Sequence, residues 1–273
     1  MGPIPNGKTL AAALVLLASA AGAAGPPSAP IKRCAPDAVV SGAGCMDKFE
    51  ASVWRVPNAT TGNRSLVSRI QQGKATAADL AAGGATQLGV GHNDDYAPCA
   101  DSGQNCVDDI FAVSLPGVQP SANITWFQAQ AACESSGKRL PSNAEWQAAV
   151  AGTPDPGPDD GTTDCNTASA FNVIPAGSRT ACKSARGAFD MVGNLYEWVA
   201  DWVPRATACG AWSAGVSPTG DDQCLAGAET TGEPGALLRG GAFFSGPLAG
   251  PLAVLGSSPP SLPNVVVGFR CAR

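Results

Sequence analysis

Apolar residues recur at helical spacing in the segment SANITWFQAQAACESSGKRL, in the middle of the chain. Phe127 and Ala131 are separated by one helical turn and so face the same side of a helix. Ser121 or Thr125 can cap the first turn, and Gly137 can end the last one. The pattern therefore predicts one helix that ends at Gly137.

A second helix is predicted directly after the first, in LPSNAEWQAAVAG. Pro141 interrupts the chain, Ser142 offers an N-cap, and Glu145 stands where a capping box requires an acid. Gly152 can end this helix. A shorter helix is predicted at TAADLAA.

Short strands are predicted in the C-terminal third, at LYEWVADW, LLRGGAFF and VVVGFRCAR, because stretches that contain glycine and proline separate these segments. CMDKFEASVWRVP predicts another short strand, which turns at Pro57. Trp198 and Trp202 are expected to serve the core rather than a ligand platform. Residues 58–119 are rich in Gly, Ala, Thr and Asn and predict loops pinned by disulfides. These elements together predict one loop-rich α+β domain.

The N-terminus, MGPIPNGKTLAAALVLLASAAGAAG, has one lysine, an apolar run from Leu10 to Ala18, and small residues that form Ala-x-Ala sites. This is the composition of a secretory signal peptide, and the run is too short to span a bilayer. We assign residues 1–24 to a signal peptide and 25–44 to a Pro-rich lead. The mature protein is expected to be secreted or periplasmic, with no transmembrane segment.

Charge and cysteine content narrow the class of protein further. The net charge is −5, with 22 acidic and 17 basic residues, so no nucleic-acid partner is expected. All 10 cysteines follow the predicted signal, which favours disulfides in an exported chain. Close neighbours suggest four local pairs and leave two cysteines over, although sequence alone does not settle connectivity. The local pairs are Cys34 with Cys45, Cys99 with Cys106, Cys165 with Cys182, and Cys209 with Cys224, and the remaining two are Cys133 and Cys271.

Four segments resemble a known family when they are taken together. ITWFQAQAACESSGKRLPSNAEWQAAVAG, GAFDMVGNLYEWVADW, LLRGGAFF and VVVGFRCAR occur in the order and approximate spacing of the formylglycine-generating enzyme, or sulfatase-modifying factor, domain. The resemblance covers residues 45–273. It implies a C-type-lectin-like α+β fold that is loop-rich and stapled by disulfides, with two helices and short antiparallel sheets. It also implies that Cys133 pairs with Cys271.

The same resemblance implies a structural calcium ion in DMVGNLYE. Calcium takes six to eight oxygen ligands, and a glycine lets the backbone turn its carbonyls inward. The implied ligands are Asp190, Gly193, Leu195 and Glu197, the middle two through their carbonyls. The alternative is that Glu197 pairs with a buried arginine, Arg239 or Arg270, while Asp190 caps a turn.

The family's oxidase chemistry needs a copper-binding cysteine pair shortly after LRGG. The matching positions here are Ser245 and Gly250, and no cysteine lies between Cys224 and Cys271. A hydroxyl does not replace a thiolate as a ligand for copper(I). Related sulfoxide synthases use three histidines for iron, whereas this chain has only His92. We therefore expect neither copper nor iron.

The sequence thus favours an exported, calcium-stabilised binding or scaffolding module, a pseudoenzyme on this fold. Its ligand would be a protein, peptide or glycan that contacts the loop 245–264. The alternative is an oxidoreductase of the same superfamily that acts without the cysteine pair on an exported peptide or small molecule. It would resemble the oxidases of pyoverdine maturation, which rely on a carboxylate, but the sequence singles out no such acid.

Overall fold

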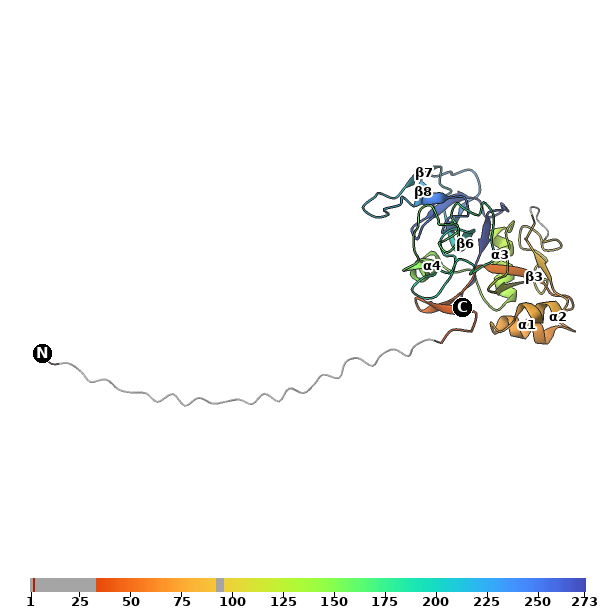
Figure 1. Ribbon diagram of the computed structural model, residues 1–273. Helices are drawn as coiled ribbons and strands as arrows, with labels where there is room; N and C mark the ends of the chain where they lie inside the picture. The colour runs from red at the N-terminus through yellow and green to blue at the C-terminus, as the bar shows by residue number, and fades with distance from the viewer. Residues whose placement is uncertain (1, 3–32, 92–95) are drawn as a thin grey trace. The chain divides into compact units, whose positions relative to one another are not determined.

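The computed structural model describes residues 2, 33–91 and 96–273 (Figure 1). The predicted signal peptide lies outside the described residues, apart from Gly2, and so does His92. Every helix and strand reported below belongs to the compact unit Lys32–Arg273.

The described residues of this unit form three sheets. The first is an antiparallel hairpin of β1 (Ala38–Ser41) and β2 (Gly44–Asp47). The second has the antiparallel order β4-β3-β5, with β3 (Ala51–Arg55), β4 (Thr86–Leu88) and β5 (Ile110–Ser114). The third has the order β11-β6-β9-β10-β8-β7. Its strands are β6 (Tyr196–Val203), β7 (Ala208–Ala211), β8 (Asp222–Ala226), β9 (Gly235–Arg239), β10 (Val254–Ser258) and β11 (Val267–Phe269).

The third sheet is mixed rather than wholly antiparallel. β11 pairs with β6, and β10 with β8, in parallel. Parallel partners cannot be joined by a tight hairpin and need a longer crossover. The connection from β8 to β10 runs through β9, and that from β6 to β11 runs through β7 to β10, so β11 reaches β6 from far along the chain.

The described residues form four α-helices, α1 (Arg64–Gln71), α2 (Ala77–Ala82), α3 (Trp126–Ser135) and α4 (Asn143–Val150), and a short 3-10 turn η1 (Gly246–Leu248). The two main predicted helices are confirmed as α3 and α4, and the short one as α2. Thr125, not Ser121, caps α3, because its hydroxyl accepts a hydrogen bond from the backbone N–H of Gln128. Ser142 and Glu145 form the predicted capping box of α4.

The region 58–119 contains more regular structure than the sequence predicted. Helix α1 and strand β5 both lie in it, and they pack together through Leu66, Ile70, Phe111 and Val113. Five consecutive buried residues give β5 no alternation that reveals a strand. A short helix such as α1 is stabilised mainly by this packing, which a local pattern does not contain.

Five disulfides fasten the loops, and their pairs are those proposed from the sequence. All ten cysteines take part. Cys34 bonds to Cys45, the residue at which the domain was predicted to begin. Strand β1 lies wholly before this residue and pairs with β2, which contains it. The structured part of the chain therefore extends into the predicted lead 25–44.

Two tryptophans hold β6 in place. The indole N–H of Trp126, in α3, donates to the carbonyl of Val199 at 2.8 Å. That of Trp146, in α4, donates to Oε2 of Glu197 at 2.7 Å. Strand β6 is thus fixed from two sides, and the loop that precedes it carries the predicted site.

Candidate functional site

The loop before β6 has a tightly curled backbone. Asp190, Gly193 and Asn194 all have positive φ, at 54°, 75° and 59°. A Cβ on Gly193 would lie 2.2 Å from the carbonyl oxygen of Asn166, so only glycine fits there. The loop therefore passes directly over a second segment of the chain around Asn166.

A buried ion pair lies directly beneath this loop. Arg270 donates from Nε and Nη2 to the carboxylate of Glu197 at 2.5–2.9 Å, and the two side chains are 0% and 1% exposed. The indole of Trp146 occupies another acceptor position of the same carboxylate. The alternative of a Glu197–arginine pair is therefore what the structure contains, with Arg270 as the partner. Arg239 lies instead over the ring of Trp146, at 4.6 Å.

Two further buried acids accompany this pair. Oδ2 of Asp190 accepts the backbone N–H of Gly177 at 2.6 Å, and burial raises the pKa of Asp190 to about 7. Glu50 is 1% exposed and accepts the backbone N–H of Leu195 at 3.0 Å and the amide of Asn194 at 2.5 Å. Burial and the nearby carboxylates raise the pKa of Glu50 well above its usual value.

Glu50 was not found from the sequence, because it lies more than a hundred residues before the loop that it contacts. No local pattern marks Glu50, and only the fold places it with Asp190 and Glu197 around Arg270.

The predicted calcium ligands fit such an ion only in part. Both oxygens of Glu197 already accept hydrogen bonds from Arg270 or Trp146. In the part of the chain that the structure describes, no group of three or more His, Cys, Asp or Glu residues is arranged to hold a metal. Asp190 and the carbonyls of Gly193 and Leu195 are the donors that remain of the predicted set. In their favour, the acids here outnumber the guanidinium that pairs with them, and a cation would balance that charge.

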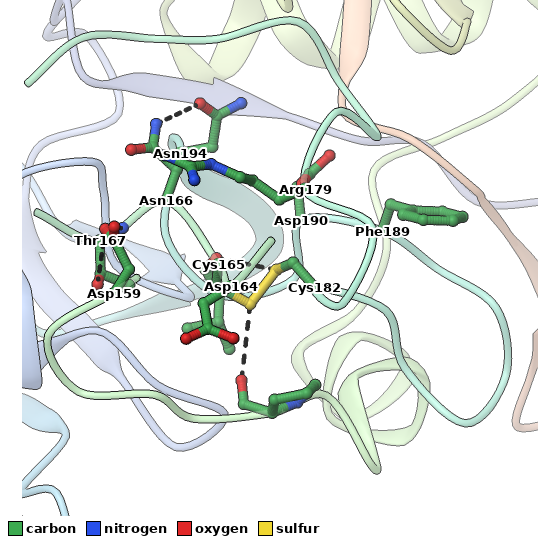
Figure 2. The surroundings of a disulfide bond; sticks show 12 residues. Asp159, Asp164, Cys165, Asn166, Thr167, Arg179, Cys182, Phe189, Asp190 and Asn194 are labelled. Carbon is green, nitrogen blue, oxygen red and sulfur yellow. Dashed lines mark hydrogen bonds between the residues drawn. A yellow bond between two sulfur atoms is a disulfide. The ribbon is translucent and has the colours of Figure 1, made fainter. Parts of the chain in front are cut away.

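A disulfide fastens the segment that faces the loop. Cys165 bonds to Cys182, and Figure 2 shows the neighbouring amides of Asn166 and Asn194 facing each other. Nδ2 of Asn166 donates to Oδ1 of Asn194 at 3.1 Å. Asp159 orders the same segment by accepting backbone N–H groups of residues 167–169. The hydrogen bond between the two asparagines joins the loop before β6 to this segment, which the disulfide and Asp159 fasten.

The position matching the first copper ligand is occupied by a serine with local structural bonds. Ser245 is 9% exposed, and its Oγ accepts the backbone N–H of Ala242 at 3.0 Å. It also lies 3.1 Å from the hydroxyl of Tyr196, whose pKa burial raises. Ser245 thus closes the turn that follows β9.

The position matching the second copper ligand has no space for a side chain. A Cβ on Gly250 would lie 2.2 Å from Cγ of Asp221 and 2.3 Å from both of its carboxylate oxygens. Asp221 is 1% exposed, and its Oδ2 accepts the backbone N–H of Leu252 at 2.6 Å. A buried carboxylate therefore stands where the side chain of a cysteine would begin. No pattern around Asp221 in the sequence predicts this contact.

The tryptophans of the same stretch differ from each other. Trp198 is fully buried and donates to the carbonyl of Ile124 at 3.0 Å, as expected of a core residue. Trp202 is 43% exposed and makes edge contacts with Trp126 and Phe127. The expectation that Trp202 is buried is therefore wrong in part, because β6 leaves the core at its last residues.

Comparisons with known proteins agree with this fold. The family model of the sulfatase-modifying factor enzyme 1-like domain matches residues 93–273. Serine/threonine-protein kinase Pkn1 of Chlamydia trachomatis serovar L2 is 30% identical over 160 residues, which are 56% of this chain and 24% of that protein. Hercynine oxygenase of Mycolicibacterium smegmatis is 33% identical over 94 residues, 31% of this chain and 22% of that protein.

The chain therefore spans about a quarter of the length of these curated relatives. Among solved structures, PvdO from Pseudomonas aeruginosa has a TM-score of 0.44 and 19% identity, and the match covers 84% of this chain and 80% of PvdO. No helix of the described residues is long and apolar enough to cross a membrane.

Proposed function

Because the chain belongs to the family of sulfatase-modifying factor enzyme 1-like domains, yet has Ser245 and Gly250 at the copper positions, we propose that it binds a ligand without oxidising it. The protein is an exported, disulfide-stapled binding or scaffolding module. It binds a protein, peptide or glycan with the loops that follow β9. It carries out no copper-dependent oxidation of cysteine.

The observation that carries this proposal is the contact between Gly250 and Asp221. A cysteine at position 250 needs both a Cβ and a sulfur, and the Asp221 carboxylate fills the place of the Cβ. The carboxylate is held there by the hydroxyl of Ser217 and the N–H of Leu252. Where the family has a cysteine, this chain therefore has a glycine covered by a buried carboxylate, and this difference supports a change of role.

The test is incubation of the purified mature protein with copper and a Cys-x-Pro-x-Arg peptide, followed by mass spectrometry for the aldehyde. We expect no aldehyde from the protein as it stands. We also expect none from the Ser245→Cys/Gly250→Cys variant, because the new Cβ collides with Asp221. Aldehyde formation by the unaltered protein would overturn the proposal.

One observation favours the alternative, an oxidoreductase that uses a carboxylate. Asp221 is a buried carboxylate at the family's active-site position, and the sequence had singled out no such acid. Oxygen consumption with the same peptide and no added copper would favour this alternative, provided that Asp221→Asn abolishes it.

We propose in addition that calcium stabilises the loop before β6, held by Asp190 and by the carbonyls of Gly193 and Leu195. The excess of buried acids around Arg270 supports this. A ligand of the native state at a hundred times its Kd adds about 2.7 kcal/mol of stability, so calcium should raise Tm and EDTA should lower it. Asp190→Asn should abolish the effect, and Glu233→Gln, at an exposed carboxylate, should not. A Tm that is the same in calcium and in EDTA would contradict the site.

A further inference from the structure

A small pocket lies next to the contact between Gly250 and Asp221. It has a volume of about 250 Å³. Its polar part is formed by Asp155, Asp221 and Ser217, and its apolar walls by Val216, Pro218, Pro251 and Leu252. Pockets that hold a drug-sized ligand have roughly 300–1,000 Å³, so this one suits a single side chain.

The two carboxylates of the pocket share one hydroxyl group. Oγ1 of Thr219 hydrogen-bonds to Oδ2 of Asp155 and lies 3.1 Å from Oδ1 of Asp221. A hydroxyl has only one hydrogen, so it can donate to only one of the two acceptors. The other carboxylate oxygen therefore faces it without a donor from this group.

Both oxygens of Asp221 have other donors, Ser217 and Leu252, and the oxygen that lacks one belongs to Asp155. Oδ1 of Asp155 exposes less than 1 Å² and has no hydrogen-bond partner in the structure. A buried carboxylate oxygen that accepts nothing costs free energy, and a positive charge held close to the carboxylate offsets part of that cost. The unsatisfied carboxylate thus favours a cation in the pocket.

The negative charge of the pocket is not balanced by contact. No ion pair of the described residues includes Asp155 or Asp221. The buried Arg239 donates to Gln147 and to the carbonyls of Pro251 and Leu252, and only the charge of Asp221, not a hydrogen bond, reaches it from the pocket. Burial and the adjacent Asp221 carboxylate raise the pKa of Asp155, as expected of two like charges that face each other.

We propose that this pocket binds the cationic side chain of a peptide, a lysine or an arginine. The ammonium or guanidinium group donates to Asp155 and Asp221, and the methylene groups of the same side chain lie along Pro218, Pro251 and Leu252. Long cationic side chains pack their stems on apolar surface in this way, and charge-assisted hydrogen bonds are the strong ones. The inference rests on the proposed binding function and specifies its ligand.

The test is isothermal titration calorimetry with four acetylated, amidated pentapeptides, Gly-Ser-X-Ser-Gly, in which X is lysine, arginine, norleucine or glutamate. The lysine and arginine peptides should bind at least tenfold more tightly than the norleucine peptide, and the glutamate peptide should not bind. Norleucine keeps the apolar stem and removes the charge, so the comparison isolates the carboxylates. Affinity should also fall as salt is added.

Asp155→Asn is the decisive variant, because it keeps the side-chain shape and Asp155 is only partly buried. It should weaken the lysine peptide at least tenfold without lowering Tm, whereas Glu233→Gln should leave the affinity unchanged. Equal binding of the lysine and norleucine peptides, an unaffected Asp155→Asn variant, or no binding of any peptide would overturn the inference. The proposed absence of cysteine oxidation is tested separately by the aldehyde assay, so the two failures are distinguishable.

Discussion

At the scale of single residues, Arg270 is a fully buried charge with partners in several segments of the domain. Besides its pair with Glu197, it donates to the backbone carbonyls of Asp47, Phe189 and Asp190. It thus connects β2, the loop before β6 and the segment that follows β11. Breaking a buried ion pair on one side leaves the other charge uncompensated, which costs more than the pair contributes as a whole.

Arg270→Met is therefore expected to lower the free energy of unfolding by about 3–5 kcal/mol, as measured by urea denaturation. The double variant Arg270→Met/Glu197→Gln should recover part of this loss, because no uncompensated carboxylate then remains at position 197. The control Arg64→Met, in α1 on the surface, should change the free energy by less than about 0.5 kcal/mol. A double variant that is less stable than the single one would contradict this explanation.

At the scale of elements, α4 was predictable because its start is encoded in four consecutive residues. Ser142 and Glu145 satisfy each other's backbone N–H groups. Glu145 also pairs with Arg139 at 2.6 Å, and this contact and the cap lower the pKa of Glu145 to about 2. The pattern is local, so the sequence contains all of it. Helix α1 has no side-chain cap and depends on packing against β5, and the sequence therefore did not reveal it.

The cap of α4 makes a prediction about pH. Because the folded pKa of Glu145 lies below its unfolded value of 4.5, its contribution is present above pH 4.5 and is lost as pH falls toward 2. Glu145→Gln should cost about 1 kcal/mol at pH 7, and the difference from the unaltered protein should shrink as the pH falls below 4.5. Unfolding free energies measured between pH 7 and pH 2 check this. A difference that stays constant over that range would refute it.

At the scale of the whole molecule, the disulfides divide into two kinds. Four of them close loops of 7 to 17 residues, whereas Cys133–Cys271 closes one of 138. The long one joins α3 to the segment after β11, and both of its cysteines are fully buried. In the chain-entropy account, a longer loop restricts the unfolded chain more.

Cys133→Ser/Cys271→Ser should therefore lower the free energy of unfolding by roughly 4–5 kcal/mol, and Cys99→Ser/Cys106→Ser by about 2–3 kcal/mol. Denaturation of both variants under the same non-reducing conditions checks the order. A larger loss for the short loop would show that loop closure is not the dominant effect.

The sequence by itself determined the features that are encoded over a few neighbouring residues. These are the capped helices α3 and α4 and the short C-terminal strands, and the order of the four motif segments also indicated the family, whereas the local cysteine pairs were a hypothesis that the structure confirmed. Local encoding suffices for the helices and strands because capping and turn geometry act between neighbours.

Only the tertiary structure decided what the predicted site contains. It paired Glu197 with Arg270, brought Glu50 to the loop before β6, and placed Asp221 against Gly250. Each of these contacts joins residues that are distant in sequence, and the energy of a buried charge depends on every group packed around it. The balance of charge in a buried site is thus a property of the folded whole, and no single segment of this chain carries it.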